Sequence, residues 1–264
     1  VISHNFTMYF QKGFFMINSN TFSNFNSKYP IYADLHTHSI SSGHGSEDTI
    51  TDMIRCASES GLSLFGISDD GPATSSSAKP SYFQSLKLAD RDRFGIRVLY
   101  GAELNIINTA GDVDLDDEIL SALDYAIISI HPPIFKPYHD KDLSSAYIRA
   151  MDHPKVRFLG HIDDARFPVD FEYLLEIAKE KHVYPEINNG SLMPDAYRIN
   201  GQENCRRILS ICKKLDLPVL LSSDSHGKKN IGNMQYIFPL LEELDFPAHL
   251  VLNSDLSVLS EIIR

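Results

Sequence analysis

The sequence predicts an α/β barrel built on parallel strands, and three observations support this fold class. Seven apolar runs rich in β-branched residues alternate with amphipathic helical patterns from residue 31 onward. The runs are almost continuously apolar, as expected for strands that are buried on both faces. No glycine-rich turn follows the first run, which argues against an open dinucleotide-binding sheet. Seven consecutive units therefore favour a closed or nearly closed barrel.

Each expected unit is a strand followed by a helix. The strands are expected at 31–35, 62–67, 96–107, 125–130, 156–162, 183–187 and 219–221. The helices are expected at 50–60, 82–93, 116–122, 142–151, 170–181, 202–215 and 234–244. Gly61 and Gly95 follow the first two helical patterns, where C-terminal glycines are common. A short strand at 249–252 and a helix at 255–263 complete the expected elements.

The chain is expected to have two parts. Residues 31–264 are expected to form one barrel domain, because no low-complexity linker or short helical repeat interrupts them. Residues 1–30 form an N-terminal arm outside the repeat, rich in Asn, Phe and Ser. Gln11 and Lys12 interrupt its apolar run and no small-residue cleavage site follows, so it differs from a signal peptide. An arm that packs on the barrel or on a neighbour, and an extension without a role, both fit this pattern.

Composition limits the partners and the compartment. The net charge of −11 over 264 residues argues against sequence-independent nucleic-acid binding, which depends on basic surface. It does not exclude anionic substrates, because bound divalent ions reverse the local field. Cys56, Cys205 and Cys212 form no Cys-x-x-Cys pair, which indicates a reducing compartment and hence the cytoplasm. No apolar stretch reaches the length of a membrane span, so no membrane partner is expected.

Metal-binding residue types gather where the expected strands end, which is where α/β barrels place their sites. His36 and His38 follow the first strand, and their i, i+2 spacing directs both imidazoles to one side of an extended chain. His44 lies in the loop beyond. The other strand ends carry Ser68-Asp69-Asp70, Glu103, His131, His161, Glu186-Ile187-Asn188-Asn189 and Asp224-Ser225-His226. Six of the eleven histidines therefore fall at one end of the barrel.

Each of these residues alone is ordinary, since a single strand-end histidine or carboxylate usually makes hydrogen bonds or faces water. Together they would crowd a buried mouth with titratable groups that nothing pairs, which is costly. Metal ions remove that cost, so the cluster predicts a metal site. Imidazole and carboxylate donors without a thiolate suit Zn, Mn or Fe.

The order of these motifs resembles the PHP family, named for polymerase-associated and histidinol phosphatase domains, and especially its compact bacterial stand-alone phosphatases. The resemblance runs from about residue 31 to the C-terminus and implies a distorted (β/α)7 barrel with a trinuclear metal site at the C-terminal strand ends. It implies a first metal on His36, His38, Glu103 and Asp224; a second on Glu103, His131 and His161; and a third on His44, Asp70 and His226. Glu103, Asp224 and His226 are expected to be catalytic as well.

One position departs from the pattern of these phosphatases. Where they usually have Thr-Asp-His-Gly, this chain has Ser68-Asp69-Asp70-Gly71. Asp70 replaces an imidazole ligand with a shorter, charged carboxylate, which is still a competent ligand for a hard metal. The third site either survives with a changed metal preference or a weaker hold, or is lost.

The resemblance implies a metal-dependent phosphoric ester hydrolase with two or three divalent ions and a metal-activated hydroxide. Three such ions less Glu103, Asp70, Asp224 and one hydroxide leave a charge of about +2, which matches a phosphomonoester dianion. A small phosphorylated metabolite is therefore the expected substrate. Arg166 and Arg198, shortly after the fifth and sixth strands, are expected to bind its phosphate; Lys136 and Lys228 are further cations, and Tyr138 and His139 are candidates for a pocket wall.

Two other functions stay open. The first is a phosphodiesterase or nuclease-type PHP hydrolase, which would need a basic groove for the second arm of its substrate. The second is a degenerate PHP domain that binds a partner without chemistry, which should lack several ligands. Here eight of the nine ligand positions keep the usual residue type and the ninth, Asp70, is still a possible ligand.

Overall fold

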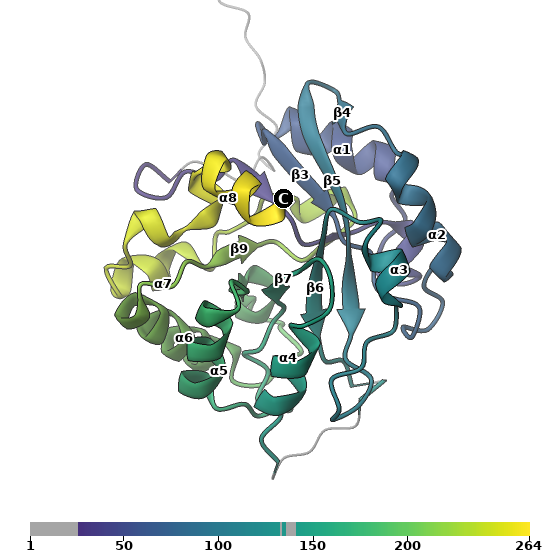
Figure 1. Ribbon diagram of the computed structural model, residues 1–264. Coiled ribbons are helices and arrows are strands. Elements are labelled where there is room, and N and C mark those ends of the chain that lie inside the picture. Colours follow the sequence, from purple (N-terminus) through teal and green to yellow (C-terminus); the bar gives the residue numbers. More distant parts are fainter. Residues whose placement is uncertain (1–25, 133, 136–140) are drawn as a thin grey trace, which may run out of the picture.

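The computed structural model describes residues 26–132, 134–135 and 141–264 (Figure 1). Seven parallel strands follow the spatial order β1-β3-β5-β6-β7-β8-β9. Their bounds are β1 Ala33–Asp34, β3 Leu64–Ile67, β5 Ile96–Asn105, β6 Tyr125–Ser129, β7 Val156–Leu159, β8 Tyr184–Asn188 and β9 Leu220–Ser222. The predicted fold class is confirmed: the strands form a nearly closed, distorted (β/α)7 barrel. Most of the predicted arm (1–25), together with Lys136, Tyr138 and His139, lies outside the described residues.

Helices cover the outside of the barrel. They are α1 Ile50–Glu59, α2 Pro80–Ser85, α3 Asp117–Leu120, α4 Ser144–Ala150, α5 Phe171–Glu180, α6 Gly201–Leu215, α7 Phe238–Glu243 and α8 Leu256–Ile263. Figure 1 shows α1 to α3 beside β3 and β5, and α4 to α6 beside β6 and β7. Within the ranges that the structure describes, none of these helices has the length and apolar character needed to cross a membrane.

The predicted helix at 82–93 is wrong in its second half. The helical segment ends with a 3-10 turn at Leu86–Leu88, and Asp92–Arg93 form β4, an antiparallel partner of β5. Phe94 and Gly95 join the two strands with φ values of 50° and 79°, as a two-residue type I′ hairpin requires. Gly95 therefore ends a hairpin turn and not a helix, whereas Gly61, with φ 84°, does follow α1 as predicted.

The predicted strand at 249–252 is also wrong. This segment forms two 3-10 turns, Ala248–Leu250 and Leu252–Ser254, with a single parallel bridge between Val219 and Val251. At the other end of the sequence, the first predicted strand is short and is followed by β2, Thr37–His38. Both differences lie between β1 and β9, where the barrel closes. Side-chain hydrogen bonds there replace part of the backbone hydrogen bonding between strands.

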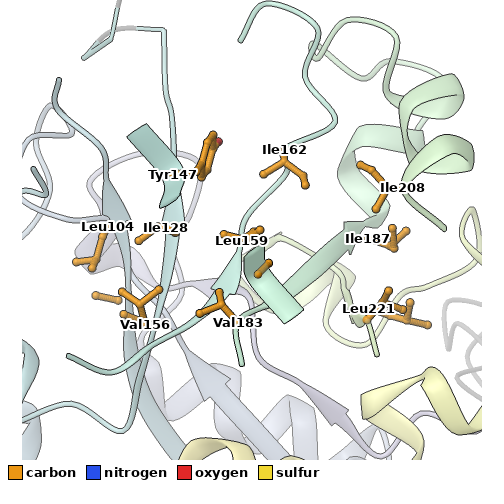
Figure 2. Packing of buried hydrophobic residues seen from close by; sticks show 14 of the residues in the cluster. Leu104, Ile128, Tyr147, Val156, Leu159, Ile162, Val183, Ile187, Ile208 and Leu221 are labelled. Atoms are coloured by element: carbon orange, nitrogen blue, oxygen red, sulfur yellow. The ribbon is translucent and has the colours of Figure 1, made fainter. Parts of the chain in front are cut away.

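Alternate residues of the strands supply two cores. In β6, Ala126 and Ile128 pack outward against the helices, whereas Tyr125 and Ile127 point into the barrel, as the two-residue period of a strand requires. Figure 2 shows the outer cluster, in which Leu104, Ile128, Tyr147, Val156, Leu159, Ile162, Val183, Ile187, Ile208 and Leu221 are buried. Residues of both sets are excluded from water, which explains the continuous apolar runs of the strands.

Helix α8 packs at the N-terminal ends of the strands. Its Leu259 and Ile263 join the inner core with Tyr125 and Phe158. The Nε of Arg157 donates to the carbonyl of Ile262 at 2.6 Å, which attaches the helix to the start of β7. Because the apolar end of the barrel is filled in this way, the polar residues of the interior lie at the opposite, C-terminal ends of the strands.

The seam between β1 and β9 is closed by two polar side chains. The Nδ2 of Asn253 donates to the carbonyls of Ala33 (2.8 Å) and Leu221 (2.7 Å), and its Oδ1 accepts from the Leu221 amide at 2.8 Å. Asp34 accepts from the amide and hydroxyl of Ser223 at 3.3 and 2.5 Å. Beyond these contacts, β10 (Ser225–His226) pairs with β2 in parallel, with His226 in register with His38.

Replacement of Asn253 by alanine should lower the free energy of unfolding by about 2–4 kcal/mol, because buried backbone groups on both sides of the seam would lose their partners. Denaturant unfolding of Asn253→Ala against wild type measures this loss. Gln202→Ala, on the exposed surface of α6, is the matched control for the loss of an amide. Equal stability of Asn253→Ala and the control would show that the side chain does not hold the seam.

Candidate metal centre

A cavity of about 420 Å³ lies at the C-terminal ends of the strands, and His44, Asp70, Glu103, His131, Asp224 and His226 are among the residues that line it. These six residues come from the loop after η1 (Ile40–Ser42), the ends of β3, β5 and β6, the β9–β10 connection and β10. The β1–β2 connection, β2 and the end of β7 supply His36, His38 and His161. The structure brings all nine predicted ligands together here, in four overlapping groups whose donor atoms lie within 4.8 Å of one another.

Glu103 belongs to two of these groups. Each of its carboxylate oxygens faces the histidines of a different group. Its Oε2 lies 3.3 Å from His36 Nε2 and 3.5 Å from His38 Nε2. Its Oε1 lies 2.9 Å from His161 Nε2 and 3.5 Å from His131 Nε2. A carboxylate in this position can bridge two adjacent ions.

Asp224 and His226 connect the first group to a third. Asp224 Oδ1 lies 3.2 Å from His38 Nε2 and 3.7 Å from His36 Nε2. His226 Nε2 lies 3.3 Å from His44 Nε2, and Asp70 Oδ2 lies 3.9 Å from the same His44 atom. Asp70 Oδ2 is also 3.2 Å from His38 Nδ1, so this carboxylate reaches toward two histidines.

The second ring nitrogens of the histidines face protein acceptors, which directs Nε2 into the cavity. His131 Nδ1 lies 2.7 Å from Asn105 Oδ1, and His38 Nδ1 lies 3.0 Å from Ser42 Oγ. His44 Nδ1 and His226 Nδ1 each lie 3.2 Å from a backbone carbonyl. A proton on Nδ1 leaves the Nε2 lone pair free, and second ring nitrogens held in this way are typical of histidines that bind metals.

Glu186 holds two of these histidines although it does not line the cavity. Its Oε1 lies 2.5 Å from His36 Nδ1 and accepts from Ser222 Oγ. Its Oε2 accepts from the amide of His161 at 2.7 Å and from Asn188 Nδ2 at 3.2 Å. Four donors on two oxygens use the full acceptor capacity of an ionised carboxylate.

Unpartnered buried atoms mark the centre as fit for cations. Nε2 of His36, Nε2 of His38 and Oδ2 of Asp70 are buried without a hydrogen-bond partner in the described part of the chain. Leaving a buried polar atom unpaired costs about 1–3 kcal/mol. These two imidazole nitrogens and one carboxylate oxygen are atoms that can coordinate a divalent cation. A bound cation would satisfy them, so the residues present fit a metal centre.

The carboxylates of the centre remain ionised at neutral pH. Burial alone would raise the pKa of Glu103, but the imidazoles of His36 and His131 and the hydrogen bond from His161 hold it well below its usual range. Burial opposes the charge of Asp224 too, yet His36 and Arg198 hold the pKa of this carboxyl well below its usual value. Both residues can therefore serve as charged ligands without first losing a proton.

Backbone conformation helps to direct the ligands. His161 and Asp224 have φ values of 28° and 53°, in the left-handed region that non-glycine residues rarely adopt. Such conformations cost of order 1–3 kcal/mol and persist where the surroundings impose them, often at functional sites. Gly45, with φ 70°, passes close to the ring of His226: a Cβ there would lie 2.6 Å from Cδ2 of that ring.

The two predicted phosphate-binding arginines line the cavity, but their guanidinium groups make different hydrogen bonds. Nε and Nη2 of Arg166 pair with the carboxylate of Asp164, and Nη1 has no hydrogen-bond partner among the residues that the structure describes. Arg198 is 8% exposed, and its Nη2 donates to Asp224 Oδ2 at 2.8 Å while Nη1 donates to Ser191 at 3.1 Å. Lys228 instead pairs with Asp48 at 2.9 Å, and it is not among the residues that line the cavity.

Sequence reasoning assigned no role to Glu186 or Asn105, although Glu186 was noted at a strand end. The signal for Asn105 was its place as the last residue of β5, two positions after Glu103 and hence on the same face. Asp69 accepts hydrogen bonds from Ser39 and Ser42 and so fixes the loop that contacts His38. Asp163, two residues after His161, is buried and makes no hydrogen bond through its carboxylate in the described part of the chain.

Comparison with known proteins places the centre in a family context. The PHP domain matches residues 34–190. A probable phosphatase of Clostridium acetobutylicum is 36% identical over 231 residues, which cover 88% of this chain and 93% of that protein. A probable phosphatase of Acetivibrio thermocellus is 33% identical over 231 residues, covering 88% of this chain and 94% of that one.

Two solved structures share the fold at low sequence identity. Histidinol phosphate phosphatase from Lactococcus lactis, solved with Zn, L-histidinol and phosphate, has a TM-score of 0.57 at 19% identity, covering 81% of this chain and 94% of that one. A chain in archaeal ribonuclease P with mature tRNA has a TM-score of 0.56 at 18% identity, covering 88% and 89%.

Replacement of Glu186 by glutamine should weaken metal binding by about 10- to 100-fold, because an amide nitrogen would face donors that now meet a carboxylate oxygen. Zinc titration against a competing chelator measures the affinity directly. Glu172→Gln, on the exposed face of α5, is the control for the loss of one negative charge. Unchanged affinity in Glu186→Gln would mean that the carboxylate does not orient the histidines.

Proposed function

The chain belongs to the PHP domain family, and from this we propose that it is a metal-dependent phosphomonoesterase that acts on a small phosphorylated metabolite. One observation carries the proposal: four overlapping groups of possible ligands, two of them sharing Glu103, meet at one cavity that Arg166 and Arg198 also line. The relatives at 33–36% identity that are named probable phosphatases support the same activity.

We propose an assignment of the ligands to three ions that the distances between their donor atoms support. His36, His38, Glu103 and Asp224 would hold one ion; Glu103, His131 and His161 a second; and His44, Asp70 and His226 a third. Nitrogen and oxygen donors without sulfur suit Zn, Mn or Fe. Divalent ions in these positions supply two kinds of chemistry: they lower the pKa of a bound water and withdraw charge from a phosphoryl group.

The protein's own residues would prepare the centre and bind the ester. Glu103, Asp224 and His226 are the proposed catalytic positions because each takes part in more than one interaction at the centre. Arg166, whose Nη1 has no partner in the described part of the chain, is the better candidate for a direct contact with the phosphoryl group. Arg198 is already bound to Asp224, so we assign it to holding that carboxylate, which leaves Oδ1 directed at the histidines.

A small monoester fits the cavity better than a nucleic-acid diester. The arginines Arg166 and Arg198 supply the cationic side chains among the lining residues that the structure describes, and the whole chain has a net charge of −11. A diester needs a basic groove for its second arm. The similarity to the ribonuclease P chain concerns the fold alone, so the centre and its charge must decide the substrate.

We also infer a cytoplasmic location from the cysteines. All three are free, and Cys205 and Cys212 are buried on α6, whereas Cys56 on α1 is partly buried. Free thiols used as small apolar residues are typical of proteins in a reducing compartment.

Hydrolysis of an aryl phosphate by the purified protein tests the proposed function. We expect activity that a chelator removes and that Mn, Zn or Fe restores, because the bound ions would lower the pKa of the attacking water and withdraw charge from the phosphoryl group. His36→Ala should lower the hydrolysis rate of the metal-reloaded protein by at least about 100-fold. The substitution removes one imidazole ligand from the group that His36 forms with His38 and Glu103. No hydrolysis with any metal, and no difference between His36→Ala and wild type, would exclude the phosphomonoesterase.

Restoring histidine at position 70 tests the third ion. If Asp70 is a weakened ligand, Asp70→His should leave activity unchanged or raise it, with tighter binding of the last metal equivalent. Metal titration followed by steady-state kinetics distinguishes these effects. A large loss of activity in Asp70→His would instead show that the carboxylate is specifically required.

A further inference from the structure

An aromatic side chain at the cavity, Tyr197, has no part in the proposed chemistry. It lies between β8 and α6 and lines the cavity together with Pro132 and Ile134, which follow β6. The residue is 62% exposed. A single exposed aromatic residue needs no explanation by itself, but this one lies where a substrate must enter.

Two arginines hold the Tyr197 ring in place. The guanidinium carbons of Arg166 and Arg198 each lie 5.1 Å from the ring centroid, within the range of cation–π attraction. Both arginines are themselves fixed, Arg166 by the carboxylate of Asp164 and Arg198 by Asp224. The exposed ring is therefore organised before any ligand arrives, which reduces the entropy lost on binding.

The remaining walls of the cavity differ in character from the Tyr197 side. Thr74 and Ser75 line it from the loop after β3. In the strand order β3 is second and β8 is sixth of seven, so in a nearly closed barrel their loops lie on opposite sides of the mouth. The cavity thus combines an ionic floor, a hydroxyl-bearing side and an apolar aromatic side.

We propose that Tyr197 is a specificity-determining residue that favours phosphomonoesters whose leaving group is a planar aromatic or heteroaromatic ring. This inference rests on the proposed function, since it places the phosphoryl group at the metal centre. The leaving group then extends toward Tyr197, Pro132 and Ile134, where a flat ring can stack on the tyrosine. An aliphatic leaving group gains no comparable contact with the ring face.

Kinetics with two esters test the preference. Tyr197→Ala should raise KM for phenyl phosphate by about 5- to 30-fold, the range expected for the loss of one stacking contact. Its KM for glycerol 2-phosphate should stay within about twofold of wild type, because no ring is stacked there. Tyr197→Phe should behave as wild type with both esters. Tyr173→Ala removes an exposed tyrosine of α5 that is not among the residues lining the cavity, and it serves as the matched control.

An equal rise of KM for both esters would overturn the inference, because Tyr197 would then act by holding the arginines. No change for either ester would overturn it as well. If wild type hydrolyses both esters in these cases, the proposed function stands while the inference fails.

A binding measurement separates the two claims when hydrolysis is absent. Calorimetric titration of the zinc-loaded protein with phenylphosphonate and with methylphosphonate needs no turnover. Tighter binding of phenylphosphonate, with the preference lost in Tyr197→Ala, would support the inference even if no ester were hydrolysed and the proposed function failed. Equal binding of the two phosphonates by wild type would overturn the inference.

Discussion

The candidate centre depends on closure of the barrel between its first and last strands. His36 and His38 belong to the start of the barrel and Asp224 and His226 to its end, almost two hundred residues later. They meet because Asn253 and Asp34 bridge the seam and because β2 pairs with β10. The buried backbone groups at this seam cannot remain unpaired without a cost of about 1–3 kcal/mol each, so closure and ligand placement are the same physical event. Side-chain bridges in place of a regular ladder also explain why the barrel is distorted here.

At the C-terminal ends of the strands, hydrogen bonds to the second ring nitrogens fix the orientation of the histidines. Their other ring nitrogens can then serve as metal ligands. Glu186, Asn105, Ser42 and two backbone carbonyls face the second ring nitrogens of five imidazoles, and every Nε2 atom among them points to the cavity. Glu103 then divides its two oxygens between neighbouring groups. The result is an array of buried, unpartnered donors whose carboxylates stay ionised. Divalent cations would satisfy these atoms, and under the proposed function they would supply the chemistry of phosphoryl transfer.

The barrel, the approximate strand positions and the nine converging residues could be predicted from sequence because hydrophobic periodicity and motif spacing are local signals. The supporting layer could not: the role of Glu186 depends on contacts with His36 and with the His161 amide, far away in the sequence. Arg198 was expected to bind phosphate, but it donates to Asp224. That contact joins two loop residues 26 positions apart in the sequence, so no local pattern predicts it. The errors at 82–93 and 249–252 have a different cause. In the first, hairpin chemistry at Phe94 and Gly95 overrides helical periodicity, and in the second the seam leaves no room for another regular strand.

We propose that Glu103 would bridge two metal ions in one cavity. Anomalous diffraction from crystals of the protein loaded with zinc, collected on both sides of the zinc absorption edge, tests it most directly. We expect two ions about 3.5–4 Å apart, as in other two-metal hydrolytic sites, with one Glu103 oxygen on each. His36 and His38 should coordinate one ion and His131 and His161 the other. A single ion, or ions that do not contact Glu103, would contradict the account.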